Sequence, residues 1–467
     1  MASSRRPAPE PDAAAVLDAV GDWLAGPLAG RRILVAVSGG LDSMVLLDAL
    51  AQLVPPSRIH VGHVDHSLQP ESASWAAFVA ERARALGIGA TLRRLEGAPA
   101  AGESLEAWAR AARYAALERI ANEAACELVA CAHHADDQVE TLLIALGRGA
   151  GPRGLAAMAT GQRPEPGSLH RPLLGLPRAV LEAHARARRL EFVEDPSNRD
   201  CRFTRNALRH RALPALEAAM PGFRVGAARA IAHLAEAEAL LGEIATEELG
   251  RLVDVDGRLA AAGLAGLSGA RQALVLRAWL NGQGLAAPSA ARLADWRRQL
   301  AAAGGPPLRL PHAGAWLCRY RDAIWIEQRD VGPPPGPVQW QWRGESCLVL
   351  PDHDALLHIL PDGPLPVDWL RSQPLLVRCA RAGDRLRPTA GRPSRTMKNL
   401  WQERAVPPWL RANLPVVEVD GRVVFAAGFG CDADAAATLA GGGAVGRGGV
   451  GLRFEARAAA DPRQRFL

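Results

Sequence analysis

Lysine is almost absent from this chain of 467 residues. Of the 55 lysine and arginine residues, only Lys398 is a lysine. So uniform a preference is most simply a coding bias, and a lone arginine therefore says little about function. The absence does exclude one class of nucleotide site. A Walker-type phosphate loop needs a lysine beside its Ser or Thr to reach the terminal phosphates, and residues 1–397 contain none.

Long apolar runs are also missing. No run approaches the roughly 20 residues that a membrane-spanning helix needs. The opening sequence, Met-Ala-Ser-Ser-Arg-Arg-Pro-Ala-Pro-Glu-Pro, lacks the apolar core of a signal peptide. We therefore expect a cytoplasmic protein with no membrane partner. The seven cysteines are scattered, with no C-x-x-C pair and no Cys/His cluster at zinc spacing, so we expect reduced thiols.

The most informative feature that is present is a glycine-rich loop. The apolar run 33–37 predicts a buried strand, and 44–50 begins an apolar helix. Glycines between them let backbone N–H groups approach an anion at the helix N-terminus, where the helix dipole favours negative charge. We predict that this loop binds the phosphates of ATP through Ser38, Gly39, Gly40, Leu41, Asp42 and Ser43. The carboxylate of Asp42 and the phosphate oxygens are both negative and repel each other, so we predict that Mg²⁺ lies between them.

Strand and helix patterns alternate after the loop. Strands are predicted at 58–65, 90–95 and 127–132, and helices at 71–86, 103–124 and 136–146. A further amphipathic helix is predicted at 16–30. This alternation is typical of an α/β fold with a parallel sheet and right-handed crossovers, which binds ligands beyond the carboxyl ends of its strands.

Composition divides the rest of the chain. Residues 216–300 are rich in Ala and Leu at helical spacing, short strands are predicted at 308–328, and Gly332-Pro-Pro-Pro-Gly336 is typical of a linker. Later strands are predicted near 347–350, 375–379 and 416–427. We therefore expect five parts: a disordered tail at 1–15, a catalytic ATP-binding domain at 16–215, a mainly helical substrate-binding domain at 216–330, a small basic α+β domain at 338–440 and a loose Gly-rich tail at 441–467.

Polar side chains mark the carboxyl edge of the predicted sheet. His63 ends the strand at 58–65, where a nucleotide would lie, although ordinary strand-end polar residues are an equal alternative. Glu106, Arg110 and Arg113 share one face of the helix at 103–124. That face is either a surface ion-pair ladder or a place where an arginine holds phosphate.

The segment His133-His-Ala-Asp-Asp-Gln-Val-Glu-Thr141 is more specific, because it follows an apolar strand and opens a helix. Helical spacing makes Asp136, Asp137 and Glu140 converge near the sheet edge. A single Asp at a helix start is usually a cap. Three carboxylates beside an ATP site favour binding of Mg²⁺, of a substrate ammonium group, or of both.

A basic segment lies near the C-terminus. Residues 371–415 contain ten basic residues against Asp384 and Glu403, a charge of +8 that exceeds the +6 of the whole chain. This segment predicts a polyanionic partner. We expect substrate contacts here from Arg385, Arg395, Lys398 and Arg411.

These segments together resemble the tRNA(Ile)-lysidine synthetase family of PP-loop ATP pyrophosphatases. The similarity covers Ser38–Ser43, His63–Leu68, Glu106–Tyr114, His133–Thr141, Gly149–Met158, Arg171–Leu174, Asp195–Pro214, Arg381–Pro388 and Leu400–Arg411. Ser67 and Gln69 depart from the family pattern, which usually has Gly and often a basic residue there.

The resemblance implies a reaction. The family uses ATP to adenylate the carbon-2 oxygen of the wobble cytidine of a CAU-anticodon isoleucine tRNA, and L-lysine then displaces AMP from carbon-2 through its ε-amino group. Arg113 and Arg205 are the candidates for stabilising charge on phosphate. Asp137 and Glu140 would hold lysine, with Asp136 near metal or amine. His133 is a general-base candidate. A homodimer is left open.

Two alternatives are weighed against this function. One is a tRNA thiolase of the same superfamily, which the missing C-x-x-C pair disfavours. The other is an RNA-binding protein with an inactive ATP site, which Asp42 and the acidic cluster disfavour.

Overall fold

The computed structural model describes residues 12–25, 28–65, 71–95, 97–98, 105–159, 161, 168–300, 305–328, 330, 332–434 and 449–457. Residues 1–11 of the expected tail, and Ser67 and Gln69, lie outside these ranges. The chain forms two compact units, residues 1–240 and 241–467. No helix in the described ranges is long and apolar enough to cross a membrane.

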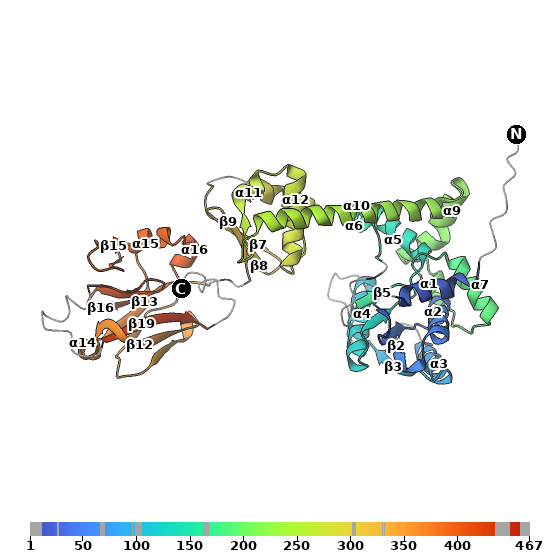
Figure 1. The fold of residues 1–467 in the computed structure, drawn as a ribbon, viewed down its shortest axis with the longest axis horizontal. Helices are drawn as coiled ribbons and strands as arrows, with labels where there is room; N and C mark the ends of the chain where they lie inside the picture. The colour runs from blue at the N-terminus through green and yellow to red at the C-terminus, as the bar shows by residue number, and fades with distance from the viewer. Residues whose placement is uncertain are drawn as a thin grey trace. The chain divides into compact units, whose positions relative to one another are not determined.

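A five-stranded parallel sheet forms the centre of the first unit, as the alternating pattern predicts (Figure 1). Its spatial order is β3-β2-β1-β4-β5, and every neighbouring pair is parallel. The strands are β1 Ile33–Ala36, β2 Ile59–Asp65, β3 Gly89–Arg94, β4 Leu128–Ala130 and β5 Ser168–His170. The α/β class of this unit is therefore confirmed.

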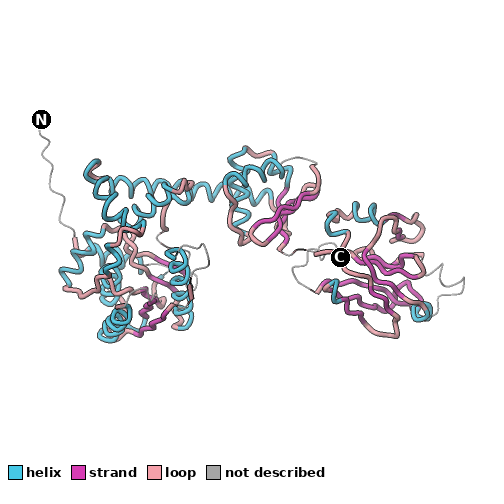
Figure 2. Tube along the Cα trace, turned by 180° about the vertical axis from the view of Figure 1, so that it is seen from behind, coloured by secondary structure: helices cyan, strands magenta, loops and turns pink. Residues whose placement is uncertain are grey.

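Helices cover both faces of this sheet because β1 is apolar on both sides (Figure 2). Ile33, Val35 and Val37 pack on one face and Leu34 on the other. The first face is covered by α1 Ala15–Leu24, α2 Leu41–Leu53, α3 Ser72–Ala85 and α7 Arg178–Arg188, and the second by α4 Leu105–Glu123. The helix predicted at 16–30 is shorter than expected and spans Ala15–Leu24, with Ala25 already in an extended conformation.

Short helices follow at the carboxyl edge of the sheet. They are α5 Ala135–Gly147, α6 Pro152–Leu155, α8 Thr204–Ala207, a π-helical turn at Leu208–Ala212, and α9 Leu213–Ala219. Val139 of α5 and Leu213 pack with Ala227 of the long helix α10 Phe223–Leu252. This small core fixes α5 against the turn that carries Arg209.

The second unit contains two cores. The first packs α11 Ala261–Ala265, α12 Gly269–Gly282 and α13 Ala290–Leu300 against a sheet ordered β6-β9-β8-β7. Its strands are β6 Leu259–Ala260, β7 Leu308–His312, β8 Ala315–Tyr320 and β9 Ala323–Glu327. The strands predicted at 308–328 are thus confirmed.

The second core lies between two antiparallel sheets, ordered β10-β13-β16-β17-β18 and β11-β12-β19. The strands are β10 Val338–Trp340, β11 Cys347–Leu350, β12 Ala355–Pro366, β13 Leu375–Cys379, β16 Pro415–Val419, β17 Arg422–Ala426, β18 Gly430–Cys431 and β19 Gly449–Ala456. A small hairpin, β14 Arg385–Leu386 with β15 Arg395–Thr396, and helices α14 Val367–Ser372, α15 Met397–Glu403 and α16 Pro408–Arg411 complete this part.

The expectation of a loose tail at 441–467 is wrong for β19. This strand pairs with β12 from Ala355↔Ala456 to Pro366↔Gly449. Val450, Leu452 and Phe454 alternate into the core. The glycines before the strand obscured this period-two pattern in the sequence.

Candidate active site

The glycine-rich loop joins β1 to α2, and its own side chains hold its shape. Gly39 has φ +92°, and a Cβ there would lie 3.4 Å from Val79 Cγ2. Ser43 Oγ donates to Gly40 O at 2.9 Å and accepts from Ser38 N at 3.2 Å. Gly40 is the N-cap of α2, so the N–H groups after it point out of the helix end. This geometry suits an anion cradle.

Asp42 lies in the first turn of α2 and faces the start of α5. Its Oδ2 is 3.7 Å from His134 Nε2, and its Oδ1 is buried without a hydrogen-bond partner among the described residues. Burial opposes the charge on Asp42, but His134, Arg178 and Arg209 outweigh it, so the pKa of Asp42 is lowered. An ionised carboxylate with an unsatisfied oxygen fits a ligand of Mg²⁺.

His134 lies at the centre of the acidic groups. It is fully buried, and its Nε2 lies 3.7 Å from Asp42 Oδ2 and 3.5 Å from Asp137 Oδ2. Its Nδ1 lies 3.8 Å from Asp136 Oδ2. His134 caps α5, and its backbone N–H donates to Asp137 Oδ2 at 3.0 Å. One buried imidazole therefore lies between Asp42 of the glycine-rich phosphate loop (Ser38–Ser43) and the acidic start of α5 (Asp136, Asp137 and Glu140), here called the acidic helix start.

The sequence predicts its neighbour, His133, as the general base instead. Burial lowers the pKa of His133 to about 3, although Asp137 acts in the opposite direction. A histidine with so low a pKa is neutral and a weak base at neutral pH, which argues against His133 as the general base. His133 and His134 are adjacent at a strand end, and the sequence does not indicate which of the two rings faces the carboxylates.

Asp137 and Glu140 both bind Arg209, a residue for which the sequence predicts no role. Arg209 Nε donates to Glu140 Oε1 at 2.6 Å, and Nη2 donates to Asp137 Oδ1 at 3.1 Å. Burial raises the pKa of Glu140, with Arg209 opposing the shift. Burial also works against the charge on Arg209, but the two carboxylates outweigh it and raise its pKa. The two carboxylates are thus brought together as predicted, around a guanidinium group.

The π-helical turn that carries Arg209 has a local cause. Pro214 has no N–H and its ring crowds the carbonyl four residues earlier, so a regular α-helical turn is disfavoured there. Leu213 N instead donates to Leu208 O, five residues back. Such wide turns are rare and occur often at functional sites.

Asp136, which the sequence predicts near a metal, has other partners in the structure. Its Oδ2 accepts from Arg178 N at 2.9 Å, and its Oδ1 is paired with Arg224 of α10. Because both oxygens are engaged by cationic or N–H groups, the structure argues against Asp136 as a metal ligand. Within the described ranges, no three His, Cys, Asp or Glu side chains are grouped as a metal site.

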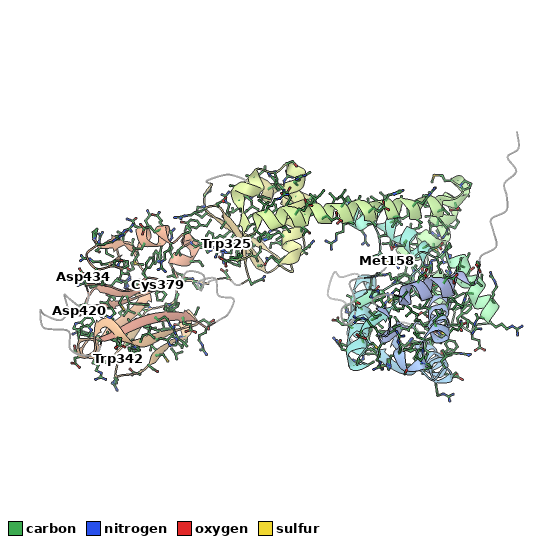
Figure 3. The ribbon with its side chains drawn as sticks, viewed as in Figure 1. Met158, Trp325, Trp342, Cys379, Asp420 and Asp434 are labelled. Carbon is green, nitrogen blue, oxygen red and sulfur yellow. The ribbon has the colours of Figure 1, made fainter. Side chains whose placement is uncertain are left out.

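Two more contacts hold the acidic helix start in place. Gln138 Nε2 donates to Met158 O and Met158 N donates to Gln138 Oε1, both at 2.8 Å; Figure 3 labels Met158. Thr141 Oγ1 donates to Asp137 O at 2.7 Å and accepts from Arg205 Nη2 at 3.4 Å. These bonds explain why the segment needs both amide and hydroxyl side chains.

A cleft of about 1360 Å³ connects these groups. Most predicted site residues line it: Ser38, Gly40, Leu41, Asp42, Ser43, His63, Arg113, His133, Asp137 and Arg205. Arg209 also lines it, whereas Glu140 is fully buried. His63 is held by a 2.8 Å bond between Nδ1 and Val37 O, and burial lowers its pKa, so its ring is neutral. Arg113 lies over the Tyr114 ring.

The predicted substrate residues of the C-terminal part differ in their surroundings. Lys398 is exposed, and Arg395 pairs with Glu403. Arg385 Nε donates to Ser394 Oγ at 3.3 Å. Arg411 is half-buried and donates to Val406 O at 2.9 Å and to Tyr320 OH at 2.9 Å, so it has a structural role.

Three regions of the chain match models of known protein families. Residues 16–216 match the model of a PP-loop domain, 259–325 that of the TilS substrate binding domain, and 375–445 that of the TilS substrate C-terminal domain. The tRNA(Ile)-lysidine synthase of Ralstonia nicotianae is 43% identical over 87% of this chain and 90% of its own. Those of Azoarcus sp. and Methylococcus capsulatus are 41% and 38% identical, over 87% and 86% of this chain and 91% and 93% of theirs.

Proposed function

Because the chain belongs to the tRNA(Ile)-lysidine synthase family, we propose that it joins the ε-amino group of L-lysine to carbon-2 of the wobble cytidine in CAU-anticodon isoleucine tRNA. In the first step the cytidine carbon-2 oxygen attacks the α-phosphorus of ATP, and pyrophosphate leaves. In the second, the neutral ε-amino group attacks carbon-2 and AMP leaves.

One observation carries this proposal: Asp42 of the phosphate loop and Asp137 of the acidic helix start flank the same buried imidazole, His134, in a common cleft. A nucleotide held by the loop would thus lie next to a group able to hold an ammonium. The adenylated cytidine and the attacking amine must meet in this way, because an aligned pair reacts far faster than two free partners.

The loop residues would bind the phosphates through backbone N–H groups at the start of α2. Arg113 and Arg205 line the cleft without an ion-pair partner among the described residues, so each can take up charge that develops on phosphate. Mg²⁺, when bound, would neutralise and orient the triphosphate. Asp42 would hold it, with the nucleotide supplying further oxygens.

The decisive experiment supplies purified protein with ATP, Mg²⁺, labelled L-lysine and CAU-anticodon isoleucine tRNA. We expect label in the tRNA with release of AMP and pyrophosphate. Elongator methionine tRNA, which carries the same anticodon, is the control and should stay unlabelled. If the isoleucine tRNA stayed unlabelled although ATP and labelled lysine were present, the result would contradict the proposal.

The two alternatives receive less support. None of the seven cysteines forms a disulfide, and burial raises the pKa of the cleft-lining Cys131, which opposes the thiolate that thiolation would need. An inactive ATP site does not account for the lowered pKa and unsatisfied oxygen of Asp42. A homodimer stays a prediction, which light scattering of the purified chain tests.

A further inference from the structure

Arg209 presents a free donor to the cleft. Its Nε and Nη2 bind Glu140 and Asp137, while Nη1 has no partner among the described residues. The side chain is 25% exposed, and Arg209 lines the cleft. Glu140 is fully buried beside it, so Glu140 holds the guanidinium in place. The cleft therefore meets a fixed cation next to the carboxylate of Asp137.

The charge of this group distinguishes among possible ligands. Arg209 is already paired with two carboxylates, those of Asp137 and Glu140, and Asp42 adds another nearby carboxylate. The carboxylates around Arg209 make this a poor place for a triphosphate or pyrophosphate, because like charges repel. Arg113 and Arg205, which make no ion pair among the described residues, suit phosphate better. A ligand with one positive and one negative group side by side matches a carboxylate next to a guanidinium.

We propose that Arg209 and Asp137 together bind the zwitterionic head of the free amino acid, Arg209 taking its α-carboxylate and Asp137 its α-ammonium group. The inference rests on the proposed function and adds a residue that selects the substrate. With the head fixed by two opposite charges, the side-chain amine is the end left free to react. A guanidinium also binds a carboxylate with a fixed geometry, which a flexible ammonium does not.

The test compares L-lysine with L-lysinamide, which keeps both amines and the chain length but lacks the negative charge. Amine-dependent AMP release from adenylated tRNA gives the KM for each. We expect the KM of wild-type protein to be about ten- to a hundredfold lower for lysine than for lysinamide, because lysinamide loses one charge-assisted hydrogen-bonded contact. Equal KM values for the two amines in wild-type protein would overturn the inference without any variant.

The matched variants are Arg209→Gln and Arg211→Gln, since Arg211 lies exposed on the same π-helical turn. Arg209→Gln should raise the KM for lysine about ten- to a hundredfold and change that for lysinamide less than about threefold. Arg211→Gln should change neither. Pyrophosphate release in the absence of amine should persist in both variants, which also reports that they are folded.

Other outcomes assign Arg209 differently. An equal rise of both KM values would mean that Arg209 only orders the carboxylates. Loss of pyrophosphate release from folded protein, judged by its circular dichroism and unfolding temperature, would place Arg209 on the phosphates. A fall in both KM values would mean that the Arg209 guanidinium competes with the substrate amine for the carboxylates. If wild-type protein modified no tRNA at all, the proposed function itself would fail.

Discussion

In the proposed function, Asp42 is the residue on which we expect the first chemical step to depend most. Its carboxylate is ionised and keeps one buried oxygen unsatisfied, as expected where a metal-bound triphosphate arrives. We expect Asp42→Asn, which preserves shape, to lower tRNA-dependent pyrophosphate release at least about a hundredfold. Binding of tRNA, measured by filter retention, should change little. Release at the wild-type rate would show that Asp42 has no role at the phosphates.

We propose that Asp137 and Glu140 both serve the second step but differ in how they do so. Asp137 lines the cleft, whereas Glu140 is buried and reaches substrate only through Arg209. We expect Asp137→Asn and Glu140→Gln each to raise the KM for lysine at least about tenfold, because each removes charge that an ammonium or its partner needs. Adenylation should persist as pyrophosphate release.

The control for this pair is Glu194→Gln, since Glu194 lines the same cleft but its side chain is 74% exposed. It should leave the KM for lysine unchanged. Lost adenylation with an unchanged lysine KM in the Asp137 and Glu140 variants would instead assign both carboxylates to the nucleotide.

At the scale of elements, His184 joins three helical segments behind the phosphate loop. Its Nε2 lies 2.9 Å from Asp48 Oδ2 on α2, and its Nδ1 lies 3.1 Å from Ala13 O just before α1. The Asp48 bond raises the pKa of His184 despite burial. Asp48 has a lowered pKa, because His184 and Arg188 outweigh the effect of burial, and it is ionised.

This arrangement predicts a pH dependence of stability. A histidine with a raised pKa in the folded state stabilises fully below its ordinary pKa of 6.5, and this stabilisation is lost as the pH rises through the raised value. His184→Gln should therefore cost about 2 kcal/mol at pH 6 and less at pH 8, measured by urea unfolding. His233→Gln on α10, whose side chain is 78% exposed, is the control. An equal cost at both pH values would contradict the role of the charge.

At the scale of the whole molecule, the +8 segment divides into paired and unpaired charges. Arg378, Arg387 and Arg395 form ion pairs with acidic residues. Arg381, Arg392 and Lys398 are exposed and make no ion pair among the described residues. The unpaired three are the better candidates for phosphate contacts with tRNA, because a paired cation must first lose its partner.

We expect the triple change of Arg381, Arg392 and Lys398 to Gln to weaken tRNA binding and to reduce the slope of log affinity against log salt by about three. Arg395→Gln should have a smaller effect, since Glu403 already neutralises it. Binding measured over a salt series tests both variants. An unchanged slope in the triple variant would exclude this surface from the tRNA contact.

Sequence alone determined the α/β class, the phosphate loop and the acidic helix start. These features depend on local signals: a buried strand, two glycines before a helix, and carboxylates three and four residues apart. The strand β19 escaped because its pairing with β12 is distant in sequence and glycines precede it.

Only the tertiary structure decided which charges meet. Arg209 lies 69 residues from Glu140 in sequence, and nothing local marks it among the many arginines of the chain. The same is true of Arg224 on Asp136, and of the choice of His134 over His133 beside the carboxylates. The shifted pKa values of Asp42, His133, Glu140 and Arg209 follow from burial and from neighbours brought together by folding. Spacing along the chain therefore identified the acidic groups, whereas packing set their partners and their charge.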